Sequence, residues 1–313
     1  MQKIKMNYRQ NKTFEEVFNE FLEDKKASNF RNGTIKHYED SYRQIVKYMK
    51  KDAEAKSIDE KVFKKFLLKC KKNNELSDNG VYIYARDLKT IINYSIAKGY
   101  TPFFRIELPK KDKHIVETYT DDELIKLLKK PDIKTCKFVE YRNWAITSFF
   151  LSTGIRLSSL LNIKISDLKL SEDEVEIIHM KARNSITVPL NNQIKNILKE
   201  YLQYRQYETA DEYLFCNVYG KQLSKSTITQ ALLNYNKNRG VSSTGIHRLR
   251  HTFAKKWIIG GNSVVSLQHI LGHSSLQMTQ NYINILVSDL KKDVDNYNIL
   301  QEFQGNKSIK MKK

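Results

Sequence analysis

The chain has 313 residues with 54 lysines and arginines against 35 acidic residues, a net charge of +19. This length allows two domains with separate cores, and so basic a surface favours a polyanion, first of all nucleic acid, over an anionic membrane. Its three isolated cysteines argue against a disulfide framework, and without a secretory signal or an apolar run long enough to span a bilayer we expect a soluble, cytoplasmic protein.

The first third of the chain has the apolar spacing of four amphipathic helices. They are predicted to begin near residues 13, 34, 57 and 77, two of them with the capping-box patterns Thr13-x-x-Glu16 and Ser57-x-x-Glu60. Together they predict an all-α domain over residues 13–105. Its lysines and arginines form either a solvated face or a contact with the DNA backbone, and the net charge favours the second.

The composition of the rest of the chain predicts a linker, a second domain and two terminal tails. A charged, proline-bounded run without periodicity predicts a linker at residues 106–119. A capping box at Thr120 opens a second domain, residues 120–296. Residues 1–12 and 297–313 are predicted to be terminal tails.

The second domain holds two candidate phosphate contacts. A helix predicted over residues 142–152 leads to Thr-Gly-Ile-Arg, where Gly154 interrupts the apolar run, so Arg156 is placed between two helices. Alternating apolar residues over 175–190 predict a β-hairpin, with Lys181 where the first strand meets the turn. Each cation is ordinarily solvated, but in a cleft each could reach a phosphate.

The densest set of reactive side chains follows, between His247 and Tyr282. His247 and Arg250 are three residues apart on a predicted helix and share one face, and His273 follows a helix break at Gly272. Arginine donates two parallel hydrogen bonds to phosphate oxygens, histidine moves protons near neutrality, and a tyrosine surrounded by such groups becomes a nucleophile. The combination predicts a site that attacks a phosphate.

Taken singly, these residues have ordinary interpretations. A tyrosine near a helix end is usually half-buried packing, and the histidine pairs 247/251 and 269/273 have the i, i+4 spacing of zinc ligands. No carboxylate or cysteine completes a zinc set, and Arg248 and Arg250 would repel a cation. We therefore expect no metal, and no cofactor either, since the chain has no phosphate-cradling Gly-rich loop.

In order and spacing, these motifs resemble the tyrosine recombinase (phage integrase) family. In that family an Arg follows Thr-Gly, a hairpin Lys precedes a Val-Pro-Leu-like strand, a His-x-x-Arg-His box opens a helix, and the nucleophilic Tyr lies nine residues after Leu-Gly-His. The matching positions are Arg156, Lys181, His247, Arg250, His273 and Tyr282. The family commonly has an acid three residues after the first Arg, where this chain has Ser159, which raises the question of how Arg156 is held.

The resemblance implies a mainly α fold with a small β-sheet or hairpin, in which a four-helix core-binding domain precedes a mixed α/β catalytic domain. It implies a bacterial or mobile-element recombinase, without a full arm-binding domain, that cleaves and rejoins DNA through a 3′-phosphotyrosyl intermediate. The implied partners are double-stranded recombination sites, a homotetramer on DNA with residues 297–313 packed on a neighbouring subunit, and accessory DNA-bending or excision factors. Two alternatives stay open: a type IB topoisomerase-like enzyme and a catalytically inactive DNA-binding regulator.

Overall fold

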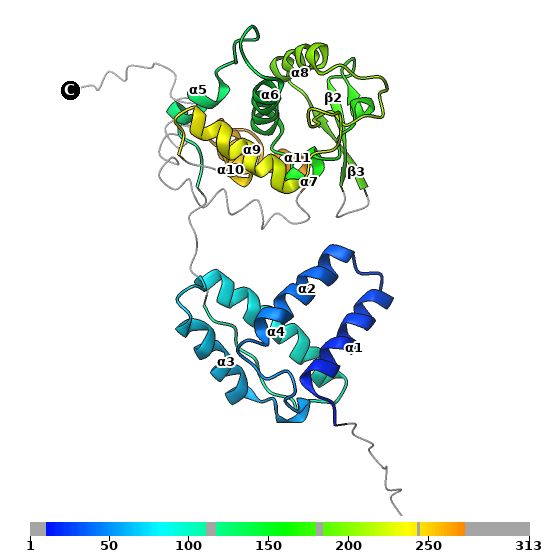
Figure 1. Ribbon diagram of the computed structural model, residues 1–313, viewed down its shortest axis with the longest axis vertical. Helices are drawn as coiled ribbons and strands as arrows, with labels where there is room; N and C mark the ends of the chain where they lie inside the picture. The colour runs from blue at the N-terminus through cyan, green and yellow to red at the C-terminus, as the bar shows by residue number, and fades with distance from the viewer. Residues whose placement is uncertain (1–10, 111–116, 180–183, 243–244, 273–313) are drawn as a thin grey trace, which may run out of the picture. The chain divides into compact units, whose positions relative to one another are not determined.

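The computed structural model describes residues 11–110, 117–179, 184–242 and 245–272. The chain divides into two compact units, Met1–His114 and Ile115–Lys313 (Figure 1). Both are mainly helical, and the described part has one small antiparallel sheet, which confirms the predicted fold class. No helix within the described ranges is long and apolar enough to cross a membrane.

The first unit is a bundle of four helices around an aromatic and aliphatic core. The helices are α1 (Phe14–Ala27), α2 (Asn32–Ile45), α3 (Glu60–Lys72) and α4 (Asp78–Ala97). The capping box at Thr13 is confirmed, because its side chain accepts from the amide of Glu16 while the Glu16 carboxylate accepts from the amide of Thr13.

The predicted capping box at Ser57 is wrong. Ser57 lies in a short 3₁₀ helix, η1 (Ala55–Ser57), and Asp59 caps α3 instead by accepting from the amide of Val62 at 2.8 Å. A carboxylate at this position satisfies an orphan amide and also places negative charge at the positive end of the helix dipole.

The second unit contains the sheet and the remaining helices. The helices are α5 (Asp121–Leu128), α6 (Phe138–Thr153), α7 (Leu157–Leu160), η2 (Ile165–Asp167), α8 (Asn192–Arg205), α9 (Lys225–Asn238), α10 (Ile246–Ile259) and α11 (Val264–Leu271). The predicted hairpin is present as β2 (Glu174–His179) and β3 (Asn184–Pro189), and the short strand β1 (Leu168–Lys169), which was not expected, pairs with β2. Valines 175 and 188 face each other across the hairpin.

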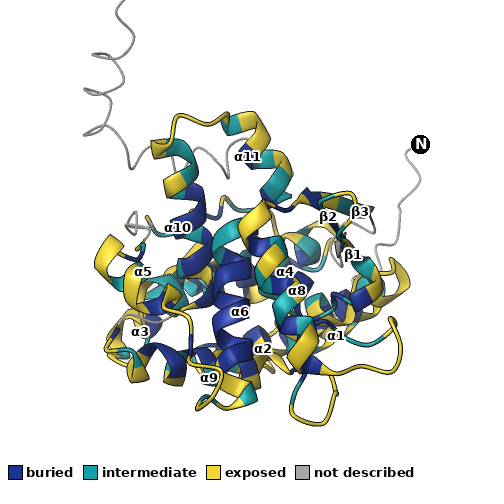
Figure 2. Ribbon diagram, turned by 90° about the horizontal axis from the view of Figure 1, so that it is seen from above, coloured by how far each residue is buried: buried dark blue, intermediate teal, exposed yellow. Residues whose placement is uncertain are grey.

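Helix α6 is the centre of the second unit's core. It is dark blue along nearly its whole length in Figure 2, because it is covered by α5, α8, α9 and α10, and even its polar residues Arg142 and Asn143 are buried. The two ends of the predicted linker are also buried: Ile106 packs in the first core and Tyr119 in the second, each no more than 6% exposed.

Candidate functional site

Arg156 occupies the helix junction that the sequence predicts. Helix α6 ends at Gly154, whose φ of 59° is left-handed, and Arg156 is the residue preceding the first turn of α7. Only glycine fits at position 154: an added Cβ would overlap the ring of Phe253 and come within 2.9 Å of Leu271 Cδ2. The close packing of α6 against α10 and α11 thus fixes where Arg156 leaves the helix.

Main-chain carbonyl groups hold both candidate arginines. Arg250, in α10 and 5% exposed, donates from Nη1 to the carbonyl oxygen of Gly154 at 2.7 Å and from Nη2 to that of Leu271 at 2.9 Å. Arg156 donates from Nη1 to the carbonyl oxygen of Gly272 at 3.0 Å. All three acceptors lie at helix C-termini, where carbonyls lack intrahelical partners and carry the negative end of the dipole.

These contacts show how Arg156 is held without an acid at position 159. Ser159 is buried in α7, and the guanidinium of Arg156 instead contacts the chain just after α11, at Gly272. Ser263 caps α11, and Gly272 ends that helix with a left-handed φ of 58°, which confirms the helix break predicted at Gly272. A carbonyl orients the guanidinium without cancelling its positive charge.

His247 lies in the first turn of α10 within the field of both arginines. Partial removal from water lowers the pKa of His247, and the positive charges of Arg250 and Arg156 lower it further. The folded chain therefore brings these three of the six predicted site residues together and favours a neutral imidazole, which can accept a proton.

His251 was missed as a perturbed group, although it shares the box with His247. Burial, His247 and Arg250 together lower the pKa of His251 to about 4, and the two imidazole ring centres lie 6.4 Å apart. The i, i+4 spacing on one helix could have indicated this, because it places both rings on the same face. A neutral His251 adds no positive charge beside the arginines.

The low pKa of His251 predicts an acid-sensitive fold. Since folding moves the pKa from its ordinary 6.5 down to about 4, protons bind the unfolded chain preferentially between those pH values. We expect the free energy of unfolding to fall as pH is lowered through this window, and to fall less in His251→Gln. Denaturant titrations at several pH values measure the difference, with the exposed His269→Gln as control; equal slopes for wild type and His251→Gln would refute it.

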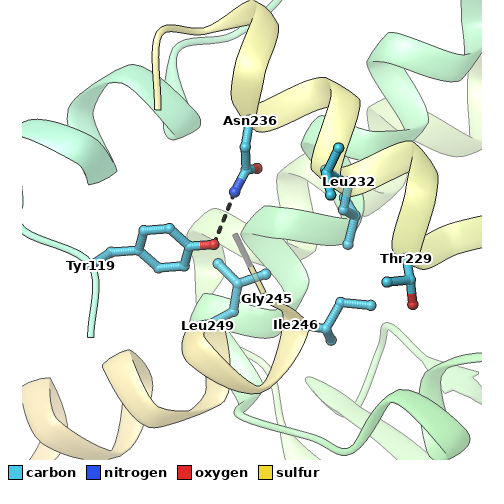
Figure 3. A pocket seen from close by; sticks show the side chains of 8 residues that line it. Tyr119, Thr229, Leu232, Asn236, Gly245, Ile246 and Leu249 are labelled. Carbon is cyan, nitrogen blue, oxygen red and sulfur yellow. Dashed lines mark hydrogen bonds between the residues drawn. The ribbon is translucent and has the colours of Figure 1, made fainter. Parts of the chain in front are cut away.

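Residues 117–119, which precede α5, also contact helix α10. Glu117 pairs with Arg248 at 3.1 Å, and the amide of Tyr119 donates to Thr252 Oγ1 at 2.9 Å. The Tyr119 hydroxyl accepts from Asn236 Nδ2 at 2.9 Å beside a cavity of about 60 Å³ behind the start of α10 (Figure 3). The cavity is small, and Ile246 and Leu249 of α10 are among the residues that line it.

The other three predicted site residues, Lys181, His273 and Tyr282, lie outside the described residues. Lys181 is in the segment joining β2 to β3, and His273 directly follows Gly272. Across the ranges that the structure describes, no group of three or more histidine, cysteine or acidic side chains could hold a metal ion.

Two family models match the chain. The one described as the phage integrase family matches residues 117–288, and the one described as the phage integrase SAM-like domain matches residues 13–111. A similar protein is the tyrosine recombinase XerC of Bacillus pumilus strain SAFR-032, 34% identical over 199 residues, which are 61% of this chain and 64% of that protein. The match thus spans slightly less than two thirds of the relative.

Solved structures show the same fold. The Tn1549 transposon integrase in complex with a circular intermediate DNA has a TM-score of 0.73 at 19% identity, over 86% of this chain and 94% of the other. A lambda integrase tetramer bound to a Holliday junction has a TM-score of 0.70 at 18% identity, over 87% and 78%.

Proposed function

This chain belongs to the phage integrase family, and from that membership we propose that it is a site-specific DNA recombinase of the tyrosine type. The observation that carries the proposal is that Arg156 and Arg250 both donate to carbonyls where α6 and α11 end, and that the charges of both act on His247. The relatives' names support the same activity, and they give no support to the topoisomerase and inactive-regulator alternatives.

In the proposed reaction Tyr282 is the nucleophile. Its hydroxyl oxygen forms a bond to a backbone phosphorus, and the bond from that phosphorus to the 5′-oxygen breaks, leaving a 3′-phosphotyrosyl link and a 5′-hydroxyl. His247 assists removal of the tyrosine proton, and Lys181 supplies a proton to the leaving oxygen. A 5′-hydroxyl from a partner strand reverses the step, so the phosphate bond energy is conserved in the covalent link and ATP is not required.

Arg156, Arg250 and His273 bind the non-bridging phosphate oxygens in this proposal. Guanidinium groups fixed before the substrate arrives stabilise the extra negative charge of the transition state without reorganising. The carbonyl contacts of the two arginines supply this orientation.

The proposed partners follow from the family. Residues 13–105 would bind duplex DNA and residues 120–296 would carry the chemistry, with a tetramer assembling on the recombination sites, as the lambda integrase does on its junction. Residues 297–313 would pack on a neighbouring subunit, and DNA-bending or excision factors would assist. The net charge of +19 is consistent with a DNA-associated protein.

The test is covalent capture on DNA. The full-length protein is incubated with a pool of nicked duplexes of randomised sequence, in which cleavage beside the nick releases a short fragment and prevents religation. We expect an adduct that survives denaturation, with the DNA attached to Tyr282. Tyr282→Phe should form none, while the control Tyr219→Phe, at an exposed tyrosine, should form as much as wild type. Attachment at another residue, or no adduct, would refute the proposal.

A further inference from the structure

The first unit contains a buried carboxylate that the proposed chemistry does not use. Asp87 in α4 is 1% exposed. Its Oδ2 accepts from Ser41 Oγ at 2.8 Å and lies 2.9 Å from His37 Nε2, and its Oδ1 accepts from Arg86 Nε and Nη2 at 3.2 and 3.0 Å. Burying a carboxylate is costly unless it is paired in this way, and a well-packed apolar pair would join α2 to α4 at least as firmly.

The groups around Asp87 are arranged with the carboxylate inside and the nitrogen-bearing side chains outside. The side chain of Asp87 is 2% exposed, whereas those of His37 and Arg86 are 43% and 50% exposed. His37 belongs to α2 and Arg86 to α4, yet Arg86 Nη2 lies 3.5 Å from His37 Nε2. One buried carboxylate therefore holds two nitrogen-bearing side chains from different helices next to each other at the surface.

The pair formed by His37 and Arg86 is suited to binding an oxyanion such as a phosphate. Arginine has five N–H groups in a rigid fork, and the contacts with Asp87 use only Nε and Nη2. A guanidinium already fixed by a carboxylate loses less rotamer freedom on binding than a solvated lysine does. Lys36, the residue before His37 in α2, is also exposed.

We propose that His37 and Arg86 form a phosphate site on the first unit, separate from the catalytic site, which binds a backbone phosphate of duplex DNA. Asp87 is its positioning residue. The choice of DNA as ligand rests on the proposed function, but binding here requires no strand cleavage. The phosphate site and the proposed recombinase activity can therefore be refuted independently of each other.

The experiment compares equilibrium DNA affinity among charge variants of the full-length chain. Arg86→Gln is expected to weaken binding to a duplex of arbitrary sequence about tenfold near 0.1 M salt and to reduce the slope of log affinity against log salt by about 0.9, as for one lost phosphate contact. The matched control is Arg43→Gln, which removes the same charge from the exposed face of α2, where Arg43 pairs with Asp40. It should change affinity less than about twofold.

Asp87→Asn separates positioning from net charge. This variant makes the protein more positive, so its net charge alone predicts tighter DNA binding. Loss of the carboxylate that positions His37 and Arg86 predicts weaker binding instead. Weaker binding with an unchanged thermal unfolding midpoint supports the site, and equal or tighter binding overturns it. If Asp87→Asn does not fold, the comparison of Arg86→Gln with Arg43→Gln decides alone. Equal affinities for those two variants overturn the site even where covalent adducts with Tyr282 form normally.

Discussion

Replacing Arg250 by alanine is expected to slow formation of the covalent DNA adduct by about 100- to 1000-fold, or ~3 to 4 kcal/mol of barrier. The guanidinium is buried and held by the carbonyls of Gly154 and Leu271, so its orientation is set before DNA binds. Overall DNA affinity should change little, because it depends on many other lysines and arginines.

Single-turnover adduct formation on a nicked duplex measures the rate, and fluorescence anisotropy with the same duplex measures affinity. Lys256→Ala is the matched control, since it removes a positive charge from the exposed side of α10. Arg156→Ala is a second variant, at a partly exposed residue, and it should slow the reaction by a similar factor. It provides the test if Arg250→Ala does not fold. Equal losses of affinity and of rate would contradict the proposed role of the arginines.

Replacing Gly154 by alanine is expected to lower the free energy of unfolding by about 2 to 5 kcal/mol. A left-handed φ costs a side-chain-bearing residue ~1 to 2 kcal/mol, and the overlap of its Cβ with Phe253 and Leu271 adds ~1 to 3 kcal/mol. The same clash would displace the carbonyl to which Arg250 donates, so the surviving folded fraction should also cleave DNA slowly.

Calorimetry or denaturant titration measures the loss of stability. Gly240→Ala is the control: its φ of 70° is also left-handed, but nothing lies within 4 Å of an added Cβ, so it should lose only the backbone contribution. Similar losses for the two variants would mean that packing around Gly154 is looser than the structure indicates.

Local signals in the sequence predicted most helix ends and the junction at Arg156. Capping residues such as Thr13 and Thr120 act within one turn of the chain, and so does a helix-ending glycine such as Gly272. The exception at Ser57 has the same local origin, because a better capping side chain, Asp59, lies two residues further on.

The acceptors of the two arginines could not be predicted in this way. Every residue has a carbonyl group, so no residue type marks the ones at Gly154 and Gly272, and the contact from Arg156 to Gly272 joins positions 116 residues apart. The buried carboxylate of Asp87 was missed for a similar reason. Its partners His37 and Ser41 are on another helix, and their meeting depends on how α2 packs on α4.

The main-chain identity of these acceptors has a consequence for how the protein would respond to random mutation. A side-chain acid can be deleted by a single codon change, but a carbonyl is retained through every substitution at its own position. In a saturation library we therefore expect Gly154 and Gly272, which set the course of the backbone, to be sensitive positions, although no substitution there removes the acceptor atom itself.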